Sequence, residues 1–240
     1  MLQLIVILLV AGLALGVYIH AIYERSSPSP KKYVNPAQLY INLCGPILFG
    51  SIAFFIISEL LKFPEQPIFA PDRTFLYAMA LLAGLGFLGS GMHSSAKMLS
   101  RFIDKKHPGY KINRFYHIYA GHLICYTSFM LFALLLSMFA IKHPYPAEGS
   151  SIFFAVAGMI FGALCIHISR KPRELVKFFW PIAGIMLITY LVIAYPHMDS
   201  ILRTPTALFI TSAAATMLGL IVIRILRALA STGHWTTTRA

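Results

Sequence analysis

The chain has 240 residues, of which 58% are hydrophobic and only 12% are charged, and its mean hydropathy is +0.73. About a quarter of the residues of an ordinary soluble domain are charged, so this composition excludes a soluble globular fold. The formal net charge of +12 does not indicate nucleic-acid binding, because the basic residues lie between hydrophobic runs and form no patch interleaved with aromatic residues. The sequence predicts an all-α, polytopic membrane protein.

Seven apolar runs recur along the chain, each close to the roughly 20 residues that cross a bilayer as a helix. In chain order, they predict transmembrane helices over residues 1–23, 38–62, 75–102, 113–141, 151–170, 175–195 and 205–229. Proline-containing segments separate several of them, including PEQP at 64–67, HPG at 107–109 and HPYP at 143–146. We expect a single transmembrane domain over residues 1–230, followed by a polar cytoplasmic tail over residues 231–240.

Basic residues are distributed unevenly between the two ends of these helices. All but four of the 20 Lys and Arg residues lie on the side that receives the 24–37, 103–112 and 171–174 connections and the C-terminus. The four exceptions are Lys62, Arg73, Lys142 and Arg203. Because positively charged loops resist translocation, the sequence predicts an N-terminus outside and a C-terminus in the cytoplasm. We expect the membrane to be a bacterial inner membrane.

Small residues indicate where helices approach closely. The first and fifth predicted helices each carry a GxxxG pattern, and the third holds four glycines within eight positions, at Gly84, Gly86, Gly89 and Gly91. Lipid gives helices no hydrophobic reason to associate, so small residues that let backbones touch mark helix contacts. We expect the third helix to be central or to leave room for a bound group.

Histidines, and not acids, are the ionisable residues of the predicted membrane interior. All eight acidic residues fall in loops or at helix ends, which argues against a proton relay or a cation transporter. Five histidines lie in predicted helices, within a few residues of the cytoplasmic boundary, at His20, His93, His117, His122 and His167. In an ordinary α-helix, His117 and His122 point about 140° apart, so we expect them not to serve one site together.

These histidines suggest one b-type haem near the cytoplasmic face, in a membrane electron-transfer component. A haem ligand must offer a neutral imidazole nitrogen, and two ligands must come from facing helices. We expect His93 and either His117 or His167 to supply them, with Gly121 opening space for the macrocycle. Two basic residues, Lys97 and Arg114, would lie near the haem propionates.

The segment Arg114-x-x-His117-x-x-x-Gly121 resembles the opening of a haem-ligating helix in transmembrane b-type cytochromes, including the ascorbate-reducible and ferric-reductase-like groups. The resemblance covers about eight residues and has three fixed letters. It implies that His117 is a haem ligand and that Gly121 gives the ring clearance. The opposite leaflet offers only His143 and His197, both in proline-containing loop sequence, so we expect at most one haem. The sequence has no flavin or nicotinamide domain, so a quinone or a redox partner protein would exchange electrons with it.

Three other interpretations fit the same residues. In a membrane metalloenzyme, three of His20, His93, His117 and His167 would hold Zn or Fe and activate water against a lipid-like substrate, although such sites usually add a carboxylate. In a small-solute carrier, the polar groups would line a pathway without a cofactor. In the third, the histidines only make hydrogen bonds between helices near the membrane interface.

Overall fold

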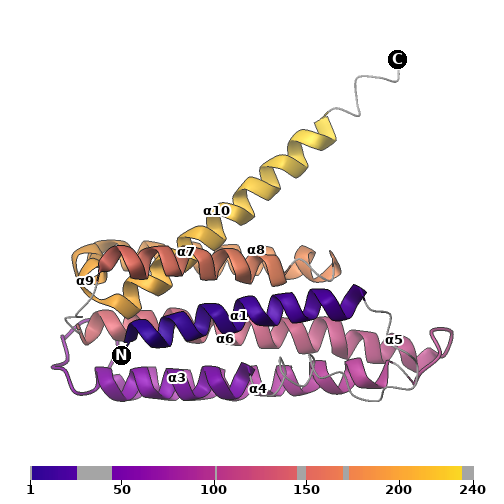
Figure 1. Ribbon diagram of the computed structural model, residues 1–240, viewed down its shortest axis with the longest axis horizontal. Helices are drawn as coiled ribbons and strands as arrows, with labels where there is room; N and C mark the ends of the chain where they lie inside the picture. The colour runs from indigo at the N-terminus through magenta and orange to yellow at the C-terminus, as the bar shows by residue number, and fades with distance from the viewer. Residues whose placement is uncertain (1, 26–44, 101, 145–149, 170–172, 234–240) are drawn as a thin grey trace.

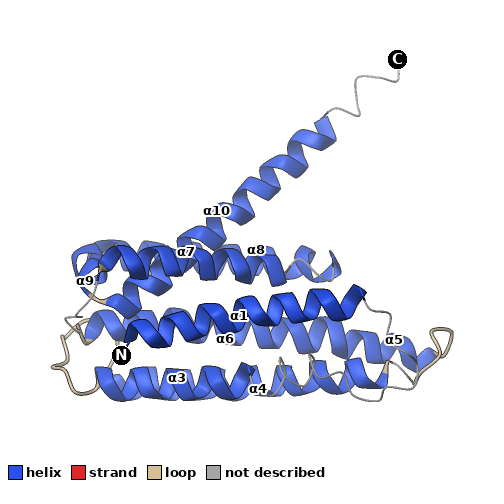
Figure 2. Ribbon diagram, in the orientation of Figure 1, coloured by secondary structure: helices blue, strands red, loops and turns tan. Residues whose placement is uncertain are grey.

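The computed structural model describes residues 2–25, 45–100, 102–144, 150–169 and 173–233, and within these ranges the chain forms helices and no strand (Figures 1 and 2). The elements, in chain order, are α1 (Leu2–Arg25), α3 (Gly45–Leu60), α4 (Asp72–Leu99), α5 (Pro108–Phe115), the π-helix η2 (Tyr116–Leu123), α6 (Ile124–Lys142), α7 (Ser151–Ile168), α8 (Arg173–Ala194), the 3₁₀ turn η3 (Tyr195–His197), α9 (Met198–Arg203) and α10 (Pro205–Gly233).

Five helical segments in the described part of the chain are long and apolar enough to cross a bilayer. They are Asp72–Leu99, Pro108–Lys142, Ser151–Ile168, Val176–Arg203 and Pro205–Arg227, and Leu2–Gly16 and Phe49–Leu60 are shorter apolar helices. Large apolar side chains also cover the outer surface: Phe54, Tyr77 and Ile152 are each at least 75% exposed. Exposed apolar surface of this extent is suited to lipid and not to water, as expected of an integral membrane protein.

Most helices begin and end close to the positions that the sequence predicts, because apolar length and proline breakers are local signals. The predicted loop at 107–109 is different. Helix α5 begins at Pro108, in the first turn, where a backbone N–H would have no partner within the helix, so the proline costs no hydrogen bond. The His107 ring caps this helix by accepting a hydrogen bond from the backbone N–H of Gly109. Residues 38–44 of the predicted second helix, and residues 234–240 of the predicted tail, lie outside the described residues.

Close packing between α7 and α10 explains the GxxxG pattern of the fifth predicted helix. A Cβ atom on Gly158 would lie 2.2 Å from the carbonyl oxygen of Phe209, and one on Gly162 would lie 2.4 Å from that of Ala213. The α10 backbone therefore fills the space that side chains at these glycines would need. Beyond this contact, α10 runs obliquely, and its C-terminal end points away from the other helices (Figure 1).

Helices α6 and α10 are more buried than α4 in the described part of the bundle, so the expectation that the third predicted helix is central is not met. Of its glycines, Gly86 and Gly89 face α6, where added Cβ atoms would lie 2.8 Å from the Phe129 ring and 2.5 Å from the Cys125 backbone nitrogen. For Gly84 and Gly91, no other described residue places an atom within 4 Å of such a Cβ. The α4–α6 pair is therefore held together along one glycine-lined face of α4.

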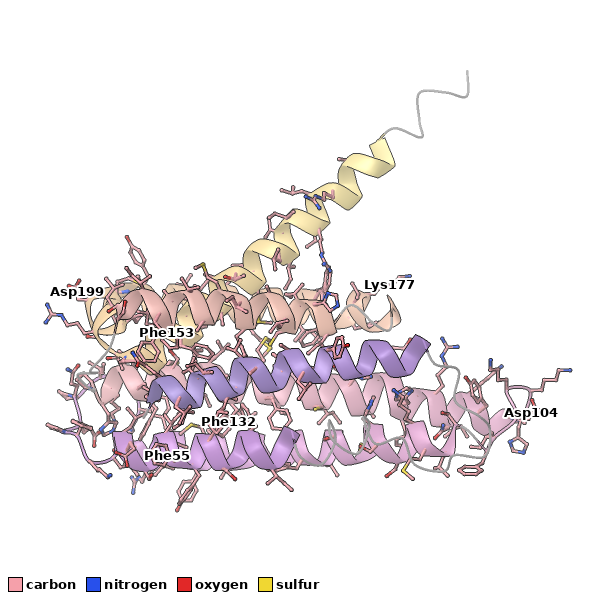
Figure 3. All side chains as sticks on the ribbon, in the orientation of Figure 1. Phe55, Asp104, Phe132, Phe153, Lys177 and Asp199 are labelled. Carbon is pink, nitrogen blue, oxygen red and sulfur yellow. The ribbon has the colours of Figure 1, made fainter. Side chains whose placement is uncertain are left out.

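Charged residues mark the two ends of the bundle. Asp104 and Lys177 lie toward one end, and Asp199 lies at the other (Figure 3). Because α4 and α6 are antiparallel, the C-terminal end of α4 lies beside the start of the 108–142 helix, and its N-terminal end lies beside the end of α6. Two clusters of polar side chains, described below, lie along this pair, one at each end.

Candidate functional site

Three histidines from two helices meet at the C-terminal end of α4. His93 comes from α4, and His117 and His122 come from η2. One ligand nitrogen of each ring lies within 4.8 Å of the other two, and the ring centroids are 4.7 Å apart for His93 and His117, 4.1 Å for His93 and His122, and 5.2 Å for His117 and His122. We call these three residues the histidine cluster.

The π-helical segment puts the two η2 histidines on one side. A π-helix bonds each backbone N–H to the carbonyl five residues earlier and has more residues per turn than an α-helix, so residues five apart lie on nearly the same face. His117 and His122 have that spacing, and η2 covers Tyr116–Leu123. The expectation that they point about 140° apart is wrong, because it assumed the α-helical register.

Glycines bring the two helices into the contact that the cluster requires. A Cβ atom on Gly121 would lie 2.8 Å from both the Cα and the nitrogen of His93. The space beside Gly121 is therefore occupied by the His93 backbone, and not left open for a macrocycle as the sequence suggested. The Asn113 side chain adds a buried hydrogen bond of 2.7 Å to the carbonyl of Ala96, which fastens α5 to α4 just beyond the cluster.

Two ring nitrogens of the cluster are buried and have no hydrogen-bond partner among the described residues: Nδ1 of His93 and Nε2 of His117. A neutral imidazole can keep its proton on one ring nitrogen and offer the lone pair of the other to a metal ion. The two unpartnered nitrogens are therefore candidates for metal ligands.

The other residues proposed from the sequence lie in different places. His167 is exposed in the last turn of α7 and is not part of the cluster. The backbone of His20 belongs to α1, but its side chain lies outside the described residues. Arg114 is exposed at the end of α5. Lys97 is half-buried and follows His93 by one turn of α4.

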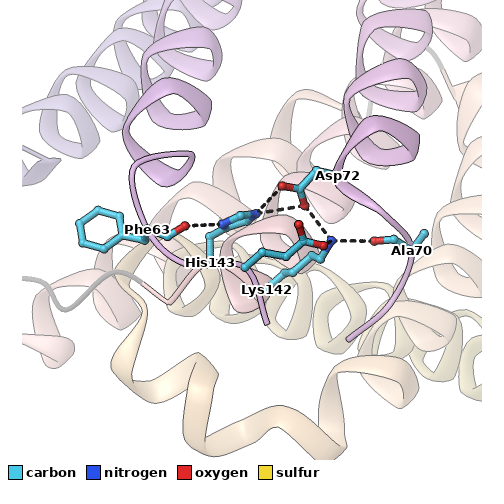
Figure 4. Close-up of polar contacts among 6 residues, drawn as sticks. Phe63, Ala70, Asp72, Lys142 and His143 are labelled. Atoms are coloured by element: carbon cyan, nitrogen blue, oxygen red, sulfur yellow. Dashed lines mark hydrogen bonds and ion pairs between the residues drawn. The ribbon is translucent and has the colours of Figure 1, made fainter. Parts of the chain in front are cut away.

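A second cluster, at the opposite end of the α4–α6 pair, was not predicted from the sequence (Figure 4). The Lys142 side chain is only 1% exposed and pairs with Glu65 and, at 2.7 Å, with Asp72, while its Nζ also donates to the carbonyl of Ala70 at 2.9 Å. Lys142 ends α6 and Asp72 begins α4, so each charge also suits the dipole of its helix. We call Glu65, Asp72, Lys142 and His143 the charge cluster.

His143 completes the charge cluster and is buried, although the sequence placed it in a loop. Its Nδ1 lies 3.0 Å from the carbonyl oxygen of Phe63, and its Nε2 lies 3.0 Å from the Asp72 carboxylate. A carbonyl only accepts, so Nδ1 carries a proton, and both ring nitrogens are in use. The cluster therefore holds the 61–71 connection against α6, and neither ring nitrogen of His143 is available as a base. Its sequence signal was the Lys-His pair directly after one apolar run and an aspartate directly before another.

Comparison with known proteins adds no assignment: no family model, no curated protein and no solved structure matches the chain.

Proposed function

We propose that this chain is a membrane metalloprotein that binds one transition-metal ion through His93, His117 and His122. The observation that carries the proposal is the convergence of three imidazoles from two helices, with their ligand nitrogens within 4.8 Å of one another. Two of those rings hold buried nitrogens that have no partner in the part of the chain that the structure describes. A buried polar atom without a partner costs free energy, and coordination to a metal would remove that cost.

Imidazole ligands suit Zn, Cu, Fe and Ni. Ligand nitrogens of a tetrahedral zinc site lie roughly 3.4 Å apart, given Zn–N distances of about 2.0–2.1 Å, so the three rings, whose ligand nitrogens lie within 4.8 Å of one another, would draw closer together around an ion. Three protein ligands leave a fourth coordination position open, as in catalytic sites. An ion bound there would supply Lewis acidity. The metalloenzyme interpretation, in which the ion activates water against a lipid-like substrate, is therefore consistent with this proposal.

The haem interpretation stays a prediction, and the geometry favours an ion over it. A haem between His93 and His117 needs the two rings on opposite faces of a macrocycle. Here the ring centroids are 4.7 Å apart, and the His93 backbone lies against Gly121, so the helices would have to separate to admit it. A quinone or redox partner protein belongs to the haem interpretation alone.

The proposal also includes the arrangement in the membrane. We infer seven spans, with the N-terminus outside and the C-terminus in the cytoplasm of a bacterial inner membrane, from the distribution of basic residues. The histidine cluster then lies near the cytoplasmic face and the charge cluster near the outer face. Reporter fusions after α4 and at the C-terminus test this: cytoplasmic reporters should be active at both positions, and an inactive reporter at either contradicts the orientation.

Metal titration of the purified protein tests the site. After removal of bound ions with a chelator in detergent, we expect Zn²⁺ or Co²⁺ to bind at one equivalent per chain. His93→Ala, His117→Ala and His122→Ala should each weaken binding at least about tenfold. The matched control is His167→Ala, which removes an exposed helical histidine and should leave binding unchanged.

Two results would contradict this function. If the wild type binds no metal ion, or if His167→Ala weakens metal binding as much as the three cluster variants do, the histidine cluster is not the metal site. An absorption spectrum of protein from haem-replete cells with a Soret band, lost in His93→Ala, would favour the haem interpretation instead.

A further inference from the structure

The contacts of His143 in the charge cluster require a proton on each of its two ring nitrogens. Nδ1 lies 3.0 Å from the backbone carbonyl oxygen of Phe63, and Nε2 lies 3.0 Å and 3.1 Å from the two carboxylate oxygens of Asp72 (Figure 4). Carbonyl and ionised carboxylate oxygens only accept hydrogen bonds. A neutral imidazole has a single N–H and can make one of these two contacts, whereas an imidazolium ring makes both.

The neighbouring charges favour this proton on His143 over Asp72. The Nζ atom of Lys142 donates to Asp72 at 2.7 Å, to the Ala70 carbonyl at 2.9 Å, and to Glu65. Three donated bonds use all three protons of an ammonium group, and an ammonium at this distance favours the ionised form of a carboxylate. The cations Lys142 and His143 then balance the anions Asp72 and Glu65. The closed cluster is therefore electrically neutral when His143 is protonated.

The two cationic residues hold the 61–71 connection near both of its ends. His143 binds the carbonyl of Phe63, and Lys142 binds the carbonyl of Ala70. Loss of the extra proton from His143 leaves its ring with one N–H, so the ring must give up either the connection or the carboxylate. The Lys142 contacts do not depend on that proton. Deprotonation therefore weakens the hold on the connection without removing it entirely.

Backbone strain within the connection favours its release. Phe69 has a φ of 61°, in the left-handed region that a bulky residue adopts only where the surrounding contacts enforce it. Its ring packs against His197, with ring centroids 4.9 Å apart, and against Phe75, at 6.5 Å. A conformation of this kind relaxes when the contacts that hold the segment are weakened.

We propose that His143 and Asp72 form a proton-dependent latch on the 61–71 connection, closed when the His143 ring is an imidazolium and released when that ring loses its extra proton. Histidine changes its charge between about pH 5 and 8, so the connection is held at acidic pH and opens as the pH rises. The latch does not depend on the proposed metal site. In the orientation proposed above, it faces the outer compartment and responds to the pH there.

Hydrogen–deuterium exchange of the full-length protein in a non-ionic detergent measures the opening. The backbone N–H of Gln66 donates to the carbonyl of Lys142 at 2.9 Å, so peptides that cover 61–71 report release of the connection. Exchange rates are divided by those of an unfolded reference peptide at each pH. We expect the resulting protection to fall about tenfold between pH 5 and pH 8, the usual effect of losing one charged hydrogen bond. Peptides from α7 should change little.

Two histidine variants identify the group that titrates. His143→Gln carries an amide that does not titrate, and its protection should be low at both pH values. His197→Gln removes the histidine that contacts Phe69 in the same connection and should keep the wild-type pH dependence. Asp72→Asn offers an amide that can donate to a neutral His143 ring, so it should also lose the pH dependence.

The wild-type profile tests the latch even where a variant fails to fold. Protection of 61–71 that does not fall as the pH rises overturns the proposal. A fall that persists in His143→Gln, or that disappears in His197→Gln, overturns the role of His143. A fall of the same size in α7 peptides means that the whole bundle loosens, and it overturns a latch confined to this connection.

Discussion

Gly121 lies directly against the backbone of His93, so that a Cβ atom at residue 121 would come within 2.8 Å of the His93 Cα. Gly121→Ala should therefore separate α4 from η2, cost about 1–3 kcal/mol of stability through overpacking, and weaken metal binding. Thermal unfolding in detergent and metal titration measure the two effects. Gly91→Ala is the control, since none of the other residues that the structure describes comes within 4 Å of its Cβ position, and it should be neutral or stabilising by up to about 1 kcal/mol. Wild-type behaviour of Gly121→Ala would contradict the contact.

The alignment of His117 with His122 should depend on the register of η2. Deleting Ala120 changes their spacing to four residues, which an ordinary α-helix places on one face, so we expect one bound metal ion to remain. Inserting one alanine after Ala120 makes the spacing six, about 120° apart in an α-helix, and should abolish binding. Metal titration of the two variants, with circular dichroism to confirm helicity, decides the matter. Equal loss in both would contradict the role given to the register.

Metal removal should destabilise the wild-type protein. An ion that binds only the folded state stabilises it by about 2.7 kcal/mol at a free concentration of 100 times Kd. Adding a chelator to metal-loaded protein should therefore lower its unfolding temperature in detergent, while His122→Ala, which lacks one ligand, should show little change. A chelator effect of the same size in His122→Ala would mean that the ion binds elsewhere.

Lys142 should be the most sensitive charged residue of the charge cluster. Lys142→Met removes a buried lysine and leaves Asp72 and Glu65 without their shared cation, but these two side chains are 22% and 48% exposed. Water can therefore solvate the remaining carboxylates in part, and we expect a loss of about 1–3 kcal/mol. Lys62→Met removes an exposed lysine that pairs with Glu59 in the same region, and such surface pairs contribute about 1 kcal/mol or less. Unfolding by denaturant in detergent compares the two variants, and equal losses would contradict the importance of burial.

The α7–α10 contact should tolerate no side chain at Gly158. Gly158→Ala places a Cβ atom 2.2 Å from the Phe209 carbonyl oxygen, which forces the helices apart and should cost about 1–3 kcal/mol. Gly219→Ala, on α10, serves as the control, because its Cβ position has no neighbour within 4 Å among the described residues. If both variants unfold at the wild-type temperature, the close approach of α7 and α10 is not what stabilises the pair.

The sequence by itself determined the helices and most of their limits. Each bilayer-crossing helix satisfies its own backbone hydrogen bonds, so an apolar run bounded by prolines and charges specifies its span locally. That is why the predicted helix over 151–170 corresponds to Ser151–Ile168, and the one over 205–229 to Pro205–Gly233. The candidate residues His93 and His117 also followed from local evidence, namely histidines beside a glycine-rich face near a boundary.

Only the tertiary structure decided which of these residues meet. His122 joins His93 because η2 adopts the π register, and that register departs from the regular α-helical rotation on which sequence periodicity depends. Lys142 and Asp72 meet across 70 residues, because α4 and α6 pack as an antiparallel pair. Hydropathy cannot specify such pairing, since lipid and neighbouring helices are equally apolar, and close contact is selected by the fit of small residues such as Gly89 and Gly121.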